Sequence, residues 1–516
     1  MTPPIRPWAV DPLPWVTGTT AAAFDAWAIQ ERNVPQAALM ERAGVAAARV
    51  VHHLHPQGAV CVLAGKGNNG GDALVAARSL AAWGREVRLV TADRPAPHPL
   101  LHDWPVSHRD AADLDDRGLE LVLVGASVVV DGLLGTGISG APRGAAGRIV
   151  EALRSCEAPV VALDVPSGVD ADQGRVAGAA VRAAATVAFG WPKLGTLLHP
   201  GRAHTGRLLV VEIGFPPLRP EDRAGLLLTP AWAQGRWPRR DPVTHKNKVG
   251  ALAVVAGRTG MAGAGILASR AALRSGAGYV RLVTDPGNRE VVQSALPEAV
   301  FVDASDPGAV REALESSRAV AVGPGMGTDE SAAHLLRQVL AVDRPRVVDA
   351  DALTLLSEGS EAVPAGARTV LTPHPGEAAR LLGDSVEGVE KDRVDATERL
   401  MDGTGVGVVV LKGAPTLVRS AAGMNVDTVA TSDLAVAGMG DTLTGAIGAF
   451  LAQGCPPADA AGLGLVATGR AGARAARGVG LQSGDIPEAL PGVFVEGPGH
   501  TDLSLPDLLL DLDPAR

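Results

Sequence analysis

Short apolar runs that end in turns rich in Gly, Asn or Asp recur along the chain and predict an α/β protein. In the first half, Ala59 to Ala64 (AVCVLA) has the continuous apolar pattern of a buried parallel strand. The turn GKGNNGGD follows directly, and a helix is expected from about Ala73 to Trp83. Glu86 to Thr91 (EVRLVT) is the next predicted strand. These elements form a βαβ unit whose polar turn can receive a ligand.

Two further predicted strands of the first half end in the same kind of polar turn. Asp131 closes an apolar, β-branched run before a loop of Gly, Thr and Ser, and Asp164 follows PVVAL just before Ser167. In an open parallel sheet the carboxyl ends of the strands face the ligand crevice. The alternatives are ordinary turns and a capping role for Asp131. Three consecutive strand ends with polar residues favour one composite site.

The second half repeats this order of strand, polar turn and helix. Its predicted strands end in the motifs GRTGMAGAG, GPGMG, VDADAL, LTPHPGE and LKGAPT, and AGMGDTLTG opens a later helix. His374 lies between two prolines at the end of its strand, which places it well to meet a ligand. In AGMGDTLTG the backbone N–H groups can cradle phosphate, and Asp441 can take a proton from an attacking hydroxyl. A helix-capping role for Asp441 is the alternative.

A proline-rich stretch separates the two halves. From Phe215 to Pro242 the chain carries six prolines and loses its hydrophobic periodicity. We therefore expect two α/β domains, over residues 1–215 and 226–494. The tail from Phe494 to Arg516 has no motif and is expected to form a short terminal helix or a contact with a partner.

Composition and charge narrow the class of protein. The 516 residues carry a formal net charge of -9, with a pI near 5.8, so the chain lacks the basic surface that nucleic acid or an anionic membrane requires. Its three cysteines are far apart in sequence, which indicates neither a disulfide framework nor a zinc site. Prolines interrupt the N-terminus where a signal peptide needs an apolar stretch, and no apolar run approaches the length of a membrane span. We expect a cytoplasmic protein.

Four motifs of the first half occur in a fixed order: GKGNNGGDALVAARSL, VVDGLLGTGISGAPRG, ALDVPSGVDADQG and TVAFGWPKLG. Together they resemble the NAD(P)H-hydrate epimerase family over residues 17–215. The resemblance implies a Rossmann-like three-layer domain that interconverts the C6 epimers of hydrated NADH and NADPH (NADHX and NADPHX), with a potassium ion held by Asn69, Asp131 and Ser167. It also implies that the substrate is lined by Asn68, Asn69, Gly70, Gly71, Asp72, Gly135, Thr136, Gly137, Ile138, Ser139, Gly140 and Ala141.

The chemistry implied for this half needs one acid/base group. A hydroxyl on the carbon next to a ring nitrogen can leave with the help of a proton, and water can then add to either face of the iminium. Asp164 is the candidate for this role. Lys193, in the last of the four motifs, is its candidate partner, which either tunes the charge of Asp164 or binds a phosphate of the substrate.

The motifs of the second half, from GPGMG to GMGDTLTG, resemble the ADP-dependent NAD(P)H-hydrate dehydratase family, a branch of the ribokinase-like fold, over residues 226–492. The resemblance implies that ADP phosphorylates the C6 hydroxyl of the S epimer with Asp441 as base, and that loss of phosphate restores NADH or NADPH. Magnesium would neutralise the phosphates. The residues implied to contact the hydrated cofactor are Ala264, Gly325, His374 and Asp441. Those implied to hold ADP or AMP are Lys412, Gly413, Ala414, Pro415, Thr416 and Gly440.

Two departures from the family patterns stand out, Arg42 in LMERAG and Met439 in AGMGD. Met439 replaces a hydroxyl residue and so removes one potential phosphate donor, although a backbone N–H remains. Two other functions use the same residues: a ribokinase-like kinase for a small alcohol, and a nucleotide-binding sensor or scaffold without turnover. The sequence leaves open whether the chain forms a homo-oligomer, whether it prefers NADHX or NADPHX, and whether ADP or ATP is the donor.

Overall fold

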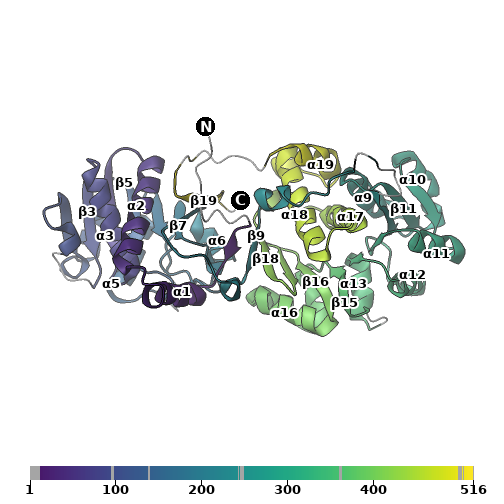
Figure 1. Ribbon diagram of the computed structural model, residues 1–516, viewed down its shortest axis with the longest axis horizontal. Helices are drawn as coiled ribbons and strands as arrows, with labels where there is room; N and C mark the ends of the chain where they lie inside the picture. The colour runs from purple at the N-terminus through teal and green to yellow at the C-terminus, as the bar shows by residue number, and fades with distance from the viewer. Residues whose placement is uncertain are drawn as a thin grey trace. The chain divides into compact units, whose positions relative to one another are not determined.

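The chain divides into two compact units. The computed structural model describes residues 12–93, 98–137, 140–241, 243, 249–359, 363–497, 503 and 505–514. One unit comprises Met1–Gly225 together with His500–Arg516, and the other is Leu226–Gly499 (Figure 1). Within the described residues, no helix is long and apolar enough to cross a membrane.

The first unit is built on one largely parallel sheet, with strand order β19-β8-β7-β6-β5-β2-β3-β4. Only β19 runs antiparallel, against β8. The strands are β2 (Ala59–Ala64), β3 (Val87–Thr91), β4 (Val106–Asp110), β5 (Ala126–Gly132), β6 (Val160–Leu163), β7 (Ala185–Phe189), β8 (Arg207–Val211) and β19 (Leu508–Leu512), and the short strand β1 (Pro14–Trp15) precedes them. Because β6, β5 and β2 are neighbours, their carboxyl ends meet at one edge, as predicted.

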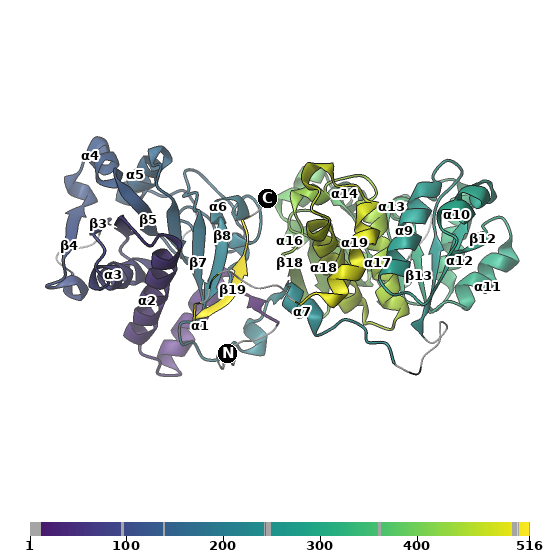
Figure 2. The same ribbon diagram turned by 90° about the horizontal axis from the view of Figure 1, so that it is seen from above.

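Helices cover both faces of this sheet. They are α1 (Gly18–Gln30), α2 (Gln36–Leu54), α3 (Asn68–Ala82), α4 (Asp116–Leu123), α5 (Gly144–Ala152) and α6 (Arg202–Thr205). One apolar core lies between the sheet and α2 with α3, and a second lies between the sheet and α4 with α5 (Figure 2). This arrangement confirms the predicted three-layer α/β architecture of the first half.

The NNGGD segment differs from its predicted conformation. We expected a turn over Asn68 to Asp72, but α3 already begins at Asn68, so these residues form its first turns. Close packing accounts for the two glycines of this turn: a Cβ on Gly70 would collide with the backbone of Gly65, and one on Gly71 with the side chain of Met40. Tertiary packing therefore outweighs the low helix propensity of Gly and Asn.

The C-terminal tail also differs from its prediction, because Leu508–Leu512 is a strand and not a helix. It pairs with β8, and the guanidinium of Arg207 donates two hydrogen bonds to the carboxylate of Asp511, at 2.7 and 2.6 Å. The run LLLDL has no polar alternation, and short apolar runs of this kind do not distinguish strand from helix. The tail thus completes the sheet of the first unit.

We expect Leu508→Ala to destabilise the first unit by about 2–5 kcal/mol, because the change leaves a cavity in a packed core. Leu508 is 2% exposed and belongs to the core that α2 and α3 cover. Calorimetry of the whole chain should show a lower melting temperature for the first unit and no change for the second. Leu510→Ala is the control: Leu510 is only half-buried, so its replacement should lower the stability of the unit by a smaller amount.

The second unit has a mixed sheet in the order β9-β18-β17-β16-β15-β14-β13-β10-β11-β12. Neighbours from β12 to β16 are parallel, and β17 is antiparallel to both β16 and β18. The strands are β9 (Gly225–Leu228), β10 (Ala251–Val255), β11 (Tyr279–Thr284), β12 (Val300–Asp303), β13 (Ala319–Val322), β14 (Arg346–Val348), β15 (Gly366–Leu371), β16 (Val406–Leu411), β17 (Leu417–Ser420) and β18 (Gly423–Asp427).

Helices again cover both faces, which confirms the α/β prediction for this half. One core lies under α7 (Pro230–Gln234), α9 (Ala262–Arg274), α17 (Met439–Ala452), α18 (Pro457–Ala475) and α19 (Asp485–Val495). A second core involves α11 (Pro307–Glu315), α12 (Glu330–Ala341), α13 (Ala350–Ser357), α14 (Pro375–Leu382), α15 (Val386–Lys391) and α16 (Arg393–Thr404). Helix α10 (Arg289–Ala295) contributes Val292 to the first of these cores.

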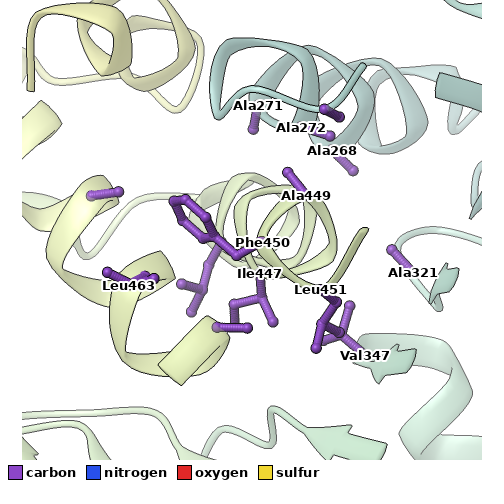
Figure 3. Close-up of a cluster of buried hydrophobic side chains, with 14 of the residues drawn as sticks. Ala268, Ala271, Ala272, Ala321, Val347, Ile447, Ala449, Phe450, Leu451 and Leu463 are labelled. Atoms are coloured by element: carbon purple, nitrogen blue, oxygen red, sulfur yellow. The ribbon is translucent and has the colours of Figure 1, made fainter. Parts of the chain in front are cut away.

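Helix α17, which carries Asp441, is fixed by small residues. Ala268, Ala271 and Ala272 of α9 face Ala449 of α17 (Figure 3). A Cβ on Gly445 would collide with the backbone of α9 at Ala268, so only glycine permits this close approach. Close packing at Gly445 and Ala449 thus sets the position of α17 against α9.

Candidate active sites

The first site lies at the carboxyl ends of β2, β5 and β6. Asp131 is fully buried, and its carboxylate accepts hydrogen bonds from the Ser167 hydroxyl (2.7 Å), the Ser167 backbone N–H (2.9 Å) and the Leu133 N–H (3.2 Å). Burial raises the pKa of Asp131, and these hydrogen bonds oppose the shift. Two of the three residues expected to hold a potassium ion, Asp131 and Ser167, are therefore in contact, and Asp131 does not cap a helix.

Asn69 lies beside these residues. Its Nδ2 donates to the carbonyl oxygens of Leu134 (2.7 Å) and Leu163 (3.1 Å), while the N–H of Leu134 donates to Ser167 (3.0 Å). The Oδ1 of Asn69 is buried and has no hydrogen-bond partner among the residues that the structure describes. Buried polar atoms rarely stay unsatisfied. Together with a carboxylate and a hydroxyl, this oxygen makes a donor set that fits a hard cation such as potassium.

The loop predicted to line the substrate packs on Asn69. A Cβ on Gly135 would lie 3.2 Å from the Cβ of Asn69, and one on Gly137 or Gly140 would meet no atom within 4 Å. These two glycines therefore border open space. Asn68, at the start of α3, accepts a hydrogen bond from Gln36 (3.0 Å). The predicted residues Ile138 and Ser139 lie outside the described part of the chain.

Asp164 and Lys193 form a buried ion pair, as the prediction of a catalytic pair requires. The Lys193 ammonium contacts Oδ1 of Asp164 and donates to the carbonyl oxygen of Phe189 (3.0 Å). The N–H of Phe189 also donates to Asp164 (3.2 Å). Asp164 has a φ of 64°, which is uncommon for a residue with a side chain and is typical of strained functional positions.

Two more carboxyl groups interact electrostatically with this pair. Burial raises the pKa of Asp72 well above its ordinary value, and the charges of Asp164 and Asp25 raise it further. Burial also raises the pKa of Asp25 to about 6, with Lys193 lowering it and Asp164 raising it. Burial thus favours the protonated forms of Asp25 and Asp72, and the charge of Lys193 opposes this effect. We had predicted Asp72 to bind substrate, but Asp25 was not among the predicted residues.

The second site centres on Asp349, a buried residue that follows β14. Its Oδ1 accepts from the Lys412 ammonium and its Oδ2 from the Thr444 hydroxyl, both at 2.7 Å. Glu377 lies 3.7 Å from the same ammonium. Burial lowers the pKa of Lys412, but the charges of Asp349 and Glu377 outweigh this effect and raise it. Sequence reasoning noted the VDADAL motif but assigned Asp349 no role.

The N-terminus of α17 meets this ion pair. A Cβ on Gly440 would lie 3.5 Å from both the Lys412 Nζ and an Asp349 carboxylate oxygen, so the two residues predicted to bind nucleotide are adjacent. The N–H groups of Gly440 and Asp441 have no acceptor within the helix. Burial and then Asp349 raise the pKa of Asp441 to about 6, and Lys412 lowers it. Gly438 is the N-cap, so Asp441 is not a capping residue.

Met439 contributes less to this N-terminus than we predicted. Its backbone N–H donates to the carbonyl oxygen of Val436 (3.4 Å), so it is engaged within the loop. Its side chain packs on the apolar core, and its sulfur lies 3.8 Å from the Thr442 hydroxyl. Among the described residues, the N–H groups of Gly440 and Asp441 are therefore the ones in this first turn that remain for a ligand.

The remaining predicted residues fall into two places. A Cβ on Gly325, whose φ is 58°, would lie 3.0 Å from the Cβ of Ala264, so these two substrate candidates are adjacent. His374 is the N-cap of α14: its Nδ1 accepts from the Gly376 N–H (3.0 Å), and its own N–H donates to Glu377 (2.8 Å). Glu377 connects His374 to the Lys412 side of the site.

The described residues contain no group of three or more His, Cys, Asp or Glu side chains that could hold a metal ion. Two acidic residues of the second site, Asp349 and Glu377, form ion pairs with Lys412.

The two units define a class: an α/β enzyme with a carboxylate–lysine ion pair at the edge of each sheet, the second of them beside a helix N-terminus. Comparison with known families agrees. The family model described as NAD(P)H-hydrate dehydratase matches residues 252–491, and that described as YjeF-related protein N-terminus matches residues 36–195. The chain is 36% identical to the bifunctional NAD(P)H-hydrate repair enzyme Nnr of Moorella thermoacetica, over 93% of this chain and 96% of that one. This chain belongs to the family of bifunctional NAD(P)H-hydrate repair enzymes.

Another curated relative has the same description, and a solved structure carries that of the dehydratase alone. The Nnr enzyme of Escherichia coli is 38% identical over 84% of each chain. Among solved structures, the ADP/ATP-dependent NAD(P)H-hydrate dehydratase of Bacillus subtilis, co-crystallised with ATP and Mg²⁺, is 28% identical and covers 52% of this chain and 97% of its own, with a TM-score of 0.46.

Proposed function

We propose that this chain repairs hydrated NADH and NADPH in the cytoplasm. The first unit epimerises NADHX and NADPHX at C6, and the second dehydrates the S epimer with ADP as the phosphate donor. The observation that carries the proposal is that each unit places an aspartate beside a lysine: Asp164 contacts Lys193 in the first, and Asp441 interacts electrostatically with Lys412 in the second. Family membership supports this function over a small-alcohol kinase and over a sensor without turnover.

In the first unit, we infer that Asp164 is the acid/base group and that its contact with Lys193 holds it in place. A proton from the carboxyl groups of this site goes to the C6 hydroxyl, which leaves as water while the ring nitrogen forms the iminium. A second water adds to the opposite face and gives its proton to Asp164. A potassium ion held by Asn69, Asp131 and Ser167 would supply a fixed positive charge for oxygen atoms of the substrate.

In the second unit, we infer that Asp441 takes the proton of the C6 hydroxyl as this oxygen attacks the terminal phosphate of ADP. Lys412 and the Gly440 N–H would hold the phosphates, and Mg²⁺ would neutralise them. The new C6–O–P group then leaves as inorganic phosphate, and loss of a ring proton restores the dihydropyridine. Ala264, Gly325 and His374 would contact the hydrated cofactor.

We expect the dehydratase rate to fall about tenfold per pH unit below about pH 6, because the base form of Asp441 must be present. Burial and Asp349 raise the pKa of Asp441, so the rate should begin to fall at a higher pH than an ordinary carboxyl group would give. Initial rates at saturating ADP between pH 5 and pH 8 would measure it. A rate that falls only near pH 4, where an ordinary aspartate titrates, would contradict the assignment of Asp441 as the base.

The test of the epimerase assignment uses a single purified epimer and no nucleotide. Chromatography should show the R epimer converting to the S epimer until both reach equilibrium. Adding ADP and Mg²⁺ should then release AMP and phosphate in step with NADH. Transfer of phosphate to a stable product, without release of NADH, would point to the kinase function instead.

A further inference from the structure

Arg393, the first residue of α16, lies beneath the segment Lys412 to Thr416. Its Nη2 donates to three carbonyl oxygens, those of Leu411 (3.3 Å), Lys412 (3.1 Å) and Pro415 (3.1 Å). Its Nη1 donates to Glu390 (2.9 Å), and the residue is only 8% exposed. The side chain therefore joins both ends of the segment.

The backbone of the segment also packs closely against the Arg393 guanidinium. A Cβ on Gly413 would lie 2.6 Å from Nη2 and 2.7 Å from Nη1 of Arg393, so the backbone rests directly on the charged group. Gly413 has a φ of 143°, which a residue with a side chain rarely adopts. Both observations require glycine at this position.

The contacts with Arg393 also fix the direction in which the N–H groups of the segment point. Because C=O and N–H point opposite ways in a trans peptide, carbonyls that face Arg393 turn the N–H groups of Gly413 and Thr416 away from it. An anion on that outer side meets N–H donors, with a permanent positive charge behind them. The Lys412 ammonium, held by Asp349, adds a second cation.

We propose that Arg393 is a positioning residue that holds Lys412 to Thr416 in the conformation that binds the phosphates of a nucleoside diphosphate. The inference rests on the nucleotide-binding role proposed above for this segment. Arg393 acts through the loop and does not itself touch the nucleotide.

Arg346 offers a matched control within the same unit. It is 5% exposed and also donates to three carbonyl oxygens, those of Leu340 (3.0 Å), Val342 (2.6 Å) and Arg344 (3.2 Å). It begins β14, whereas the proposed active site lies at the carboxyl end of that strand. Removing either arginine leaves carbonyl oxygens without a hydrogen-bond donor. Of the two arginines, only Arg393 contacts the segment Lys412 to Thr416.

The experiment compares Arg393→Met, Arg393→Lys and Arg346→Met in the full chain. Titration calorimetry with Mg²⁺ and ADP gives the dissociation constant, and dehydratase assays give KM for ADP and kcat. We expect Arg393→Met to weaken ADP binding about tenfold or more, since hydrogen bonds from a charged group are lost, with kcat at saturating ADP nearly unchanged. Arg393→Lys should recover part of the affinity, and Arg346→Met should leave it unchanged.

Each outcome decides one claim. Wild-type affinity in Arg393→Met, or the same weakening in Arg346→Met, would overturn the positioning role and leave only a structural one. If Arg393→Met does not fold, wild-type affinity in Arg393→Lys would overturn the role, and weaker ADP binding with unchanged kcat would support it. If the wild-type chain binds no ADP, the proposed nucleotide-binding function fails, and the positioning role fails with it.

Discussion

Replacing Asp441 with asparagine should lower the dehydratase rate by about 10²–10⁴-fold and leave epimerisation at the wild-type rate. Asparagine keeps the shape of the side chain but cannot take a proton from the C6 hydroxyl. Asp441 is suited to this step because burial and Asp349 raise its pKa to about 6, so it is a stronger base than an exposed carboxylate and is still ionised at neutral pH.

The control for this variant is Asp329→Asn. Asp329 is also an acidic residue at a helix N-terminus, where it caps α12 by accepting from the Ala332 N–H at 3.0 Å. Asparagine caps helices about as well as aspartate, so this variant should keep both activities. A dehydratase rate in Asp441→Asn within tenfold of the wild-type rate would contradict the role of Asp441 as base.

Replacing Lys193 with methionine should abolish epimerisation and destabilise the first unit by about 3–5 kcal/mol, because it leaves buried carboxylates without their cation. The loss of stability in this variant should grow as pH rises. Asp25 and Asp72 have folded-state pKa values above the ordinary range, and Lys193 is what lowers them. Stability from such groups is present at low pH and is lost as pH rises through the folded pKa, which for Asp25 lies above about 6 once Lys193 is removed.

A double variant separates the catalytic role from the structural one. Lys193→Met with Asp164→Asn removes one cation and one carboxylate together, so it should regain most of the stability lost in the single variant, while epimerisation stays absent. Thermal unfolding at two pH values and chromatography of a single epimer would measure the two effects. Epimerisation at a wild-type rate in the folded double variant would show that neither residue takes part in the reaction.

The sequence predicted those parts of the sites that lie at strand ends. Asp131, near the end of β5, and Ser167, after β6, lie in contact at one edge of the first sheet. The composite site expected at three strand ends has this basis, because parallel strands bring their carboxyl ends to one edge whatever the length of the connections.

The residues that sequence reasoning missed depend on packing between distant elements. Asp25 lies on a covering helix, and its only signal is one acidic residue in the otherwise uncharged run GTTAAAFDAWAIQ. No pattern shows that this helix brings Asp25 close enough to Lys193 and Asp164 to interact with their charges. Arg393 likewise precedes the loop that it holds by about one helix and one strand. Apolar periodicity indicates that a helix packs, but not which side chains it places in a site.

The most direct test of the central claim is the near-ultraviolet absorbance of NADH, followed after the wild-type chain is mixed with both C6 epimers of NADHX, Mg²⁺ and ADP. Two active sites predict complete recovery of NADH, since the first unit keeps supplying the S epimer as the second consumes it. Recovery that stops at the initial fraction of the S epimer would contradict the epimerase assignment, and no recovery would contradict the dehydratase assignment.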